Sequence, residues 1–370
     1  MKTKKGEVKT KKGKKEIRVA VAGVGNCVSM LVQGIEFYRN NKTEVGLMHP
    51  DLGGYKISDI KVVAAFDVNK DKVGKDLSKA IFEPNTINTV KISKVPNLGV
   101  EVMKAPTLDG IGEFLGTKVK VSDKKDVDVV SVLKKTGAEV LINYIPVGSY
   151  QATRFYAEAA LEAKCAFINF IPEFIASDKQ WTDRFEKAKL PIIGDDNKGQ
   201  LGASILSRVL ANLFNERGGK VERMYQLNFG GNTDFLNLLE HSRLKFKRIS
   251  KTETVQSQFS ERLDAENIHI GPSDYVAWLK SRKIANVRIE GKTFGEVPIF
   301  IDLKLDVEDK SVASGVAVDA IRCAKIALDR GIGGVLESAS AYFMKFPAKQ
   351  YPDWRARQML EEFIEGKRER

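Results

Sequence analysis

The sequence predicts an α/β protein that combines a doubly wound parallel sheet with an inserted α+β domain. Three observations lead to this prediction. Buried-type strands alternate with helices up to about residue 200, polar or glycine-rich loops follow several of these strands, and the pattern changes to alternating strands after about residue 220. Alternating strands and helices are typical of parallel sheets, which bind ligands beyond the carboxyl ends of their strands.

The composition is that of a globular protein. Of the 370 residues, 43% are hydrophobic and 29% are charged, which excludes disordered, collagen-like and coiled-coil proteins. The length predicts two structural units, and no apolar stretch approaches the ~18 residues of a membrane span. The three cysteines and three histidines are too scattered for a zinc cluster. We therefore expect a soluble, cytoplasmic protein without a membrane partner.

The charge is concentrated at the N-terminus. The net charge is +12, and residues 1–16 carry eight lysines against two glutamates. Such a cluster can neutralise the phosphates of nucleic acid or of a membrane surface. This segment has no aromatic residue to stack on bases and no amphipathic period. We therefore expect 1–16 to be a basic disordered tail, and we do not expect a nucleic-acid partner.

The first strand–helix–strand unit carries a dinucleotide signal. A buried-type strand over 17–22 runs into Gly23-x-Gly25 and a helix over 28–38, and the next strand, 60–66, ends at Asp67. The glycines allow the backbone to approach a pyrophosphate, and the helix N-terminus offers free N–H groups to it. The carboxylate of Asp67 would bind ribose hydroxyls and repel a 2′-phosphate, which favours NAD over NADP. The third glycine of the usual motif is Val28 here, so a simple tight turn remains the alternative.

The remaining elements follow in the order that a Rossmann-type fold requires. In the first unit we expect helices near 70–81, 110–115 and 150–164, and strands over 140–145, 166–169 and 192–193. In the second we expect strands over 222–228, 285–290 and 297–305, followed by helices over 312–331 and 358–365.

Lysines form a second candidate constellation. Lys247 and Lys251 are four residues apart and share one face of a helix, and Lys283 and Lys345 lie in short polar motifs. Like charges that are desolvated together lower one another's pKa, which turns a lysine into an acid or base near neutral pH. Spacing alone does not distinguish these lysines from ordinary surface residues. The same holds for the carboxylates Asp195, Asp196, Asp234 and Asp309.

Nine segments together resemble the myo-inositol-1-phosphate synthases, in the shorter prokaryotic form. They are 21–27, 64–68, 106–110, 143–149, 194–196, 225–235, 247–252, 271–279 and 338–345. The resemblance extends from about residue 17 to residue 365. It implies an isomerase that cyclises D-glucose 6-phosphate to 1L-myo-inositol 1-phosphate by oxidation at C5, enolisation, aldol closure and re-reduction, with NAD recycled. The alternative from the residues alone is an NAD-dependent dehydrogenase with net hydride transfer on a phosphorylated small molecule.

The resemblance also implies the site residues. The implied catalytic residues are Lys247, Lys251, Lys283, Lys345 and Asp234. The implied cofactor-binding residues are Gly23, Gly25, Asn26, Cys27, Asp67, Asn143, Tyr144, Pro146, Asp196 and Asp309. Our hypothesis makes Lys247 the main proton shuttle at the C5 oxygen, with Lys345 beside the C1 oxygen. Lys251 and Lys283 then neutralise the phosphate and the enolate, and Asp234 orients a lysine.

Two questions stay open after the resemblance. The family often has Asp at the position of Ser281, which leaves Lys283 without an evident carboxylate partner, and Asp274 is one substitute. Family members also hold a cation near the positions of Asp196 and Asp309, so a divalent cation of unknown identity is a possible second cofactor.

The resemblance implies a division of the chain and an assembly. The expected units are an NAD-binding Rossmann domain over 17–200, a catalytic and oligomerisation domain over 201–311, and helices over 312–370 that return to the first domain. It further implies a homotetramer assembled through the sheet of the inserted domain.

Overall fold

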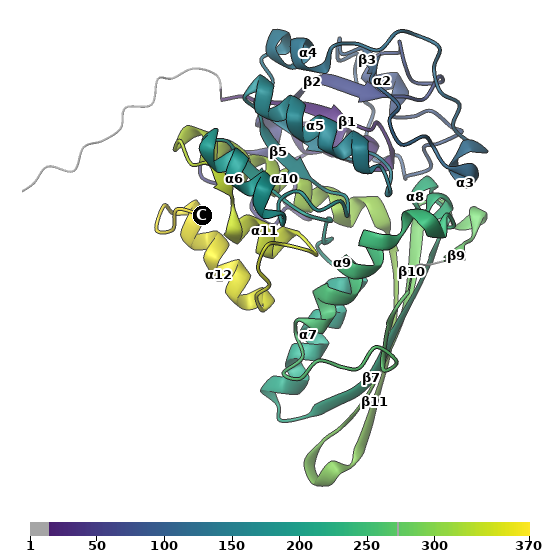
Figure 1. The fold of residues 1–370 in the computed structure, drawn as a ribbon, viewed down its shortest axis with the longest axis vertical. Helices are drawn as coiled ribbons and strands as arrows, with labels where there is room; N and C mark the ends of the chain where they lie inside the picture. The colour runs from purple at the N-terminus through teal and green to yellow at the C-terminus, as the bar shows by residue number, and fades with distance from the viewer. Residues whose placement is uncertain (1–14, 272–273) are drawn as a thin grey trace, which may run out of the picture.

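A computed structural model describes residues 15–271 and 274–370. Most of the expected basic tail therefore lies outside the described residues. Two sheets dominate the described part of the chain, and the second extends away from the first (Figure 1). No helix in that part is long and apolar enough to cross a bilayer.

The first sheet is a seven-stranded, doubly wound parallel sheet, as the sequence predicted. Its strand order is β12-β6-β5-β4-β1-β2-β3, and all its pairings are parallel. The strands are β1 (Ile17–Ala22), β2 (Ile60–Asp67), β3 (Val102–Lys104), β4 (Val140–Asn143), β5 (Ala166–Asn169), β6 (Pro191–Ile193) and β12 (Gly334–Val335).

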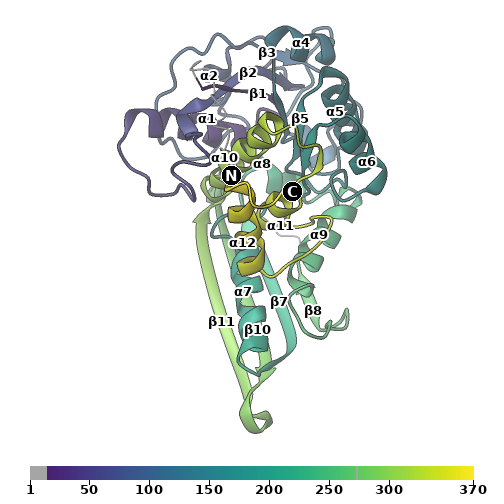
Figure 2. The same ribbon diagram turned by 90° about the vertical axis from the view of Figure 1, so that its left-hand side faces the viewer.

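Helices cover both faces of this sheet because successive side chains of a strand point to opposite faces. Val19 and Val21 of β1 belong to the core beneath α1 (Asn26–Asn40) and α10 (Asp309–Asp329). The intervening Ala20 belongs to the opposite core. The helices of that second face are α4 (Val129–Thr136), α5 (Tyr150–Ala163) and α6 (Lys179–Lys187). Figure 2 shows the two layers from the side.

The first unit differs from the sequence prediction in several elements. The helix expected near 70–81 shrinks to α2 (Leu77–Ala80), and the one near 110–115 is the short α3 (Glu113–Gly116). Strands β3 and β12 and helices α4 and α6 were not predicted. β3 has only three residues, too few for a period to be recognised in the sequence.

The second sheet consists mainly of three long antiparallel strands. β7 (Lys220–Gly230), β10 (Arg282–Lys292) and β11 (Pro298–Glu308) each have 11 residues, and β10 lies in the middle. The short β8 (Ile268–Ile270) and β9 (Asp274–Tyr275) pair parallel with β7. The helices of this unit are α7 (Ala203–Glu216), α8 (Thr233–Asn237) and α9 (Lys245–Gln256).

The chain returns to the parallel sheet without a loop. β11 ends at Glu308, and α10 begins at Asp309 and packs onto the first sheet. Glu308 accepts a hydrogen bond from the backbone N–H of Ser311 and thereby caps this helix. The helices α11 (Glu337–Phe343) and α12 (Asp353–Ile364) complete the fold.

Candidate active site

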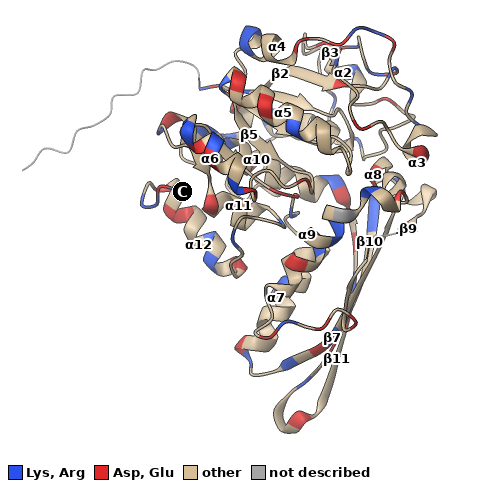
Figure 3. Ribbon diagram, viewed as in Figure 1, with Lys and Arg blue, Asp and Glu red and all other residues tan. Residues whose placement is uncertain are grey.

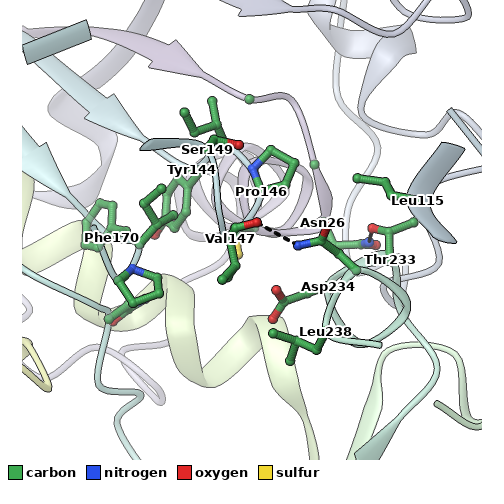
Figure 4. A pocket seen from close by; sticks show the side chains of 18 of the residues that line it. Asn26, Leu115, Tyr144, Pro146, Val147, Ser149, Phe170, Thr233, Asp234 and Leu238 are labelled. Carbon is green, nitrogen blue, oxygen red and sulfur yellow. Dashed lines mark hydrogen bonds between the residues drawn. The ribbon is translucent and has the colours of Figure 1, made fainter. Parts of the chain in front are cut away.

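A large cavity lies where the carboxyl ends of β1, β2 and β4 meet α8, α9 and the start of α10. This is the edge at which an open parallel sheet binds ligands. One end of the cavity is formed by the glycine turn after β1, and the other by lysines and aspartates. Figure 4 shows part of the lining, with Tyr144 beside Phe170 and Asp234 directed toward the cavity.

The glycine turn is shaped by close backbone contact on one side and by open space on the other. Gly23 has φ +86°, and a Cβ added there would lie 2.7 Å from the carbonyl oxygen of Tyr144. A Cβ added at Gly25 would meet no protein atom within 4 Å. Only glycine therefore fits at position 23, whereas position 25 keeps the cavity free for a ligand at the N-terminus of α1.

The carboxylate of Asp67 holds this turn against the end of β2. Its oxygens accept hydrogen bonds from the backbone N–H groups of Val24 (2.8 Å), Val68 (2.7 Å) and Asn69 (2.8 Å). Lys72, which the sequence analysis did not single out, is buried next to it and donates to the carbonyl of Val24 (2.7 Å). Burial lowers the pKa of Lys72, and the nearby Asp67 opposes that shift.

The other expected cofactor residues have different surroundings. Asn26, Cys27, Tyr144 and Pro146 line the cavity. The amide of Asn26 also fastens a neighbouring loop, since its oxygen accepts from the backbone of residues 88 and 89. Asn143 does not reach the cavity. It is fully buried, and its amide donates to the side chains of Thr153 and Asn169.

Five lysines meet at the opposite end of the cavity, and they come from four separate elements. Lys247 and Lys251 lie on α9, Lys283 at the start of β10, Lys310 at the start of α10 and Lys345 just after α11. Figure 3 shows the basic segments of α9 and of the adjoining end of β10 at the junction of the two sheets.

Asp196, in the loop after β6, bridges two of these lysines. Its Oδ1 accepts from the Nζ atoms of Lys247 and Lys345, both at 3.1 Å, and its Oδ2 accepts from the hydroxyl of Ser250. Burial alone would raise the pKa of Asp196, but the two ammonium groups and the hydroxyl hold it below its usual value. The neighbouring Asp195 points away and accepts bonds from residues 175–177.

Asp309 bridges a second pair of lysines, Lys283 and Lys310. Its Oδ1 accepts from Lys283 (3.0 Å) and its Oδ2 from Lys310 (2.7 Å). Lys310 also lies 3.9 Å from Asp234 Oδ2. The two ammonium groups overcome the effect of burial and hold the pKa of Asp309 well below its usual value. The site thus contains two carboxylates, the buried Asp196 and the largely buried Asp309, each shared by two lysines.

Lys251 differs from the other four lysines. Within the described chain it has no carboxylate within ion-pair distance, and its Nζ donates to the carbonyl of Gly271 at 3.4 Å. Burial and the neighbouring Lys247, Lys283 and Lys345 lower the pKa of Lys251 to about 7. Burial lowers the pKa of Lys345 more than its bond to Asp196 raises it, and the result is a pKa of about 8. The site therefore holds two lysines that can exchange protons near neutral pH.

Comparison with known proteins agrees with this geometry. Residues 202–310 match the family model for myo-inositol-1-phosphate synthase. The chain is 54% identical to the inositol-3-phosphate synthase of Mycolicibacterium smegmatis over 358 residues, covering 95% of this chain and 98% of that protein. It is 52% identical to the inositol-3-phosphate synthase of Mycobacterium tuberculosis, covering 95% and 96%. The chain belongs to the myo-inositol-1-phosphate synthase family.

Solved structures of this family have the same fold. A myo-inositol-1-phosphate synthase-related protein from Thermotoga maritima superposes with a TM-score of 0.79 at 25% identity, covering 95% of this chain and 98% of the other. The inositol-3-phosphate synthase of Caenorhabditis elegans superposes with a TM-score of 0.76, covering 95% and 86%. Its identity is 15%, so it supports the fold alone.

The structure answers the question raised by Ser281. Lys283 of this synthase-family chain has Asp309 as its carboxylate partner, contributed by the next strand–helix junction. Asp274 does not take that part: it is exposed, and its carboxylate accepts from the backbone of Tyr275. Ser281 is 2% exposed, and its hydroxyl has no partner in the described chain. We find no role for it.

Lys310 is the functional candidate that the sequence analysis missed. It is 6% exposed and lines the cavity next to Cys27 and Asp234. In the sequence it is one of four lysines that directly follow an aspartate, and only its contacts with Asp309 and Asp234 distinguish it. The possible divalent cation receives no support, since the described residues include no group of three or more His, Cys, Asp or Glu side chains that could hold a metal ion.

Proposed function

We propose that this chain is an NAD-dependent inositol-3-phosphate synthase that cyclises D-glucose 6-phosphate to 1L-myo-inositol 1-phosphate. The observation that carries the proposal is the meeting, in one cavity, of a dinucleotide-type glycine turn and a cluster of five buried or half-buried lysines. An ordinary dehydrogenase needs the first feature and not the second. Family membership supports the same reaction.

The residues around the glycine turn fit the binding of NAD. The open space at Gly25 and the N-terminus of α1 suit a pyrophosphate. Asp67 suits the hydroxyls of the adenosine ribose, and Asn26, Cys27, Tyr144 and Pro146 line the path toward the lysines. The bound cofactor would supply the hydride acceptor, and later the donor, at C5 of the sugar. Asn143 would act indirectly, by ordering the ends of β4 and β5.

The charge of the site fits a sugar phosphate. Five lysines (247, 251, 283, 310 and 345) face three aspartates (196, 234 and 309) at this end of the cavity, which leaves an excess of two positive charges when all are ionised. A phosphate monoester carries roughly −1.5 to −2 at pH 7. The bound phosphate would therefore neutralise the cluster.

The pairings divide the lysines into two kinds. Lys247 is held in its charged form by Asp196, which raises its pKa against the effect of burial. We therefore assign to Lys247 the electrostatic stabilisation of the C5 oxygen, and we assign the proton transfers to Lys251 and Lys345. This changes our first hypothesis, in which Lys247 was the main proton shuttle. Fixed cations beside oxygens that gain negative charge are the largest source of rate enhancement in many enzymes.

The open face of the second sheet fits the expected homotetramer. Tyr225 and Leu227 of β7 and Phe300 of β11 are 42%, 41% and 56% exposed. They lie on the face opposite to α7 and α9, because the side chains that alternate with them form the buried core. Exposed aromatic residues on one continuous face are typical of contact surfaces. We propose that this face joins the subunits.

Incubation with glucose 6-phosphate and a substoichiometric amount of NAD tests the reaction. The assay measures inositol phosphate together with absorbance in the NADH band. Product in excess of the NAD supplied, with no accumulated NADH, is the expected result. Stoichiometric NADH without cyclic product would instead identify a dehydrogenase.

A further inference from the structure

Every oxygen of the two bridging carboxylates already accepts a hydrogen bond from a side chain of the site. All four oxygens of Asp196 and Asp309 accept a hydrogen bond from a lysine ammonium or from the hydroxyl of Ser250. A hard divalent cation requires several oxygen ligands, chiefly carboxylates and waters. The residues present therefore do not fit the divalent cation that the family resemblance allowed.

Lys310 lies between two carboxylates that a cation would otherwise need. Its ammonium group is 2.7 Å from Asp309 and 3.9 Å from Asp234. Asp234 belongs to α8 and Asp309 to α10, so Lys310 joins two elements that are distant in the sequence. A metal ion at this point would be repelled by Lys310 and by Lys283, which shares Asp309 with it.

The position of Lys310 is electrostatically costly for a purely structural residue. It is the second residue of α10, where the helix dipole disfavours a positive charge. It is also nearly completely buried. A lysine in such a place requires the negative charges of Asp309 and Asp234, and these charges in turn face the cavity.

We propose that Lys310 is a built-in cation that takes the place of a divalent metal ion in the active site, so that the reaction requires no metal. This inference rests on the proposed function. The ammonium keeps Asp309 ionised and in place. It also adds a fixed positive charge next to the cavity, where oxygen atoms of the substrate gain negative charge.

Manganese binding tests the proposal without any measurement of turnover. Mn²⁺ is titrated into the NAD-bound wild-type protein and into Lys310→Ser, with free Mn²⁺ measured by electron paramagnetic resonance. The wild type is expected to bind no stoichiometric Mn²⁺. The variant, in which Asp309 Oδ2 and Asp234 lose the ammonium of Lys310, is expected to bind one ion. Stoichiometric binding by the wild type, or no gain in a folded variant, overturns the proposal.

Measurements of enzyme activity provide a second test of the proposal. After treatment with a chelator, the wild type should keep its full rate and gain nothing from added Mg²⁺, Mn²⁺ or Zn²⁺. Lys310→Ser should lose about 100-fold, as expected for the removal of one preorganised charge, and should regain at least about tenfold with methylammonium or Mn²⁺. A wild type inactivated by chelation refutes the idea, even if the variant fails to fold.

Lys325→Ser is the matched control. Lys325 lies on the same helix and also bridges two carboxylates, those of Glu139 and Asp329, but it does not line the cavity. This variant should keep the wild-type rate and should not respond to methylammonium. If the wild type makes no inositol phosphate, the proposed function fails, and the manganese titration still decides whether Lys310 occupies a cation site.

Discussion

The low pKa of Lys251 has a consequence for stability that can be measured. A lysine whose pKa is lowered from 10.5 to about 7 in the folded protein is destabilising, because one pKa unit corresponds to about 1.4 kcal/mol. The full shift would correspond to about 5 kcal/mol. Since part of the side chain faces the cavity and its solvent, we expect about 2 kcal/mol. Lys251→Met should therefore stabilise the protein while it lowers the rate at least about 100-fold.

The contribution of Lys251 to the free energy of unfolding depends on pH with a definite sign. Between about pH 7 and pH 10.5 the unfolded chain carries the proton on Lys251 and the folded protein does not. The contribution of Lys251 to stability therefore rises with pH over this range, and the penalty is complete only below about pH 7. The gain in stability of Lys251→Met over the wild type, measured as a shift in the urea midpoint, should be larger at pH 7 than at pH 9.5.

Lys247→Met is the matched control, because it makes the same substitution one helical turn earlier. Lys247 is paired with Asp196, and its removal leaves that buried carboxylate with one ammonium fewer. This variant should therefore be less stable than the wild type. The reasoning is refuted if both variants shift the midpoint in the same direction, or if Lys251→Met is destabilised at pH 7.

Three further predictions test the cofactor end, the lysine cluster and the assembly. Gly25→Val should leave the unfolding midpoint nearly unchanged and abolish NAD binding in a fluorescence titration, since its side chain enters open space. Gly23→Val should instead lower the midpoint, because its side chain would clash with the backbone of Tyr144. Equal shifts of the midpoint in the two variants would contradict the different roles assigned to Gly23 and Gly25. Lys247→Ala should abolish cyclisation with NAD affinity unchanged, so an active variant refutes its role. Phe300→Asp should reduce the mass seen by light scattering while the circular dichroism spectrum stays that of the wild type; a persisting tetramer would exclude this face.

Local patterns in the sequence were sufficient to predict most of the fold. The glycine turn, the buried strands β1, β2 and β4, and the change to antiparallel strands depend on short-range periodicity. The structure confirms the doubly wound parallel sheet that they predicted. Short elements such as β3 were missed, because tertiary contacts rather than local preference determine them.

The pairings within the site could not be predicted in the same way. Asp196 joins lysines that are 51 and 149 residues away in the sequence, and no local pattern shows which lysine meets which carboxylate. Asn143 shows a second limit. The family resemblance implied that it contacts the cofactor, whereas in the structure its amide connects two neighbouring strands.

Because β11 runs directly into α10, the register of the second sheet determines where the first residues of α10 lie in the active site. Lys283 faces Val307 across the ladder, and Asp309 follows two residues later, so strand register alone determines that these two charges meet. Residues added to the distant turn 293–297 would leave this alignment intact. A single residue inserted within β11 would rotate Asp309 and Lys310 out of alignment with Lys283. The tip of the long hairpin can therefore change in length without affecting the site. The number of residues along its strands is constrained by the pairing of Lys283 with Asp309.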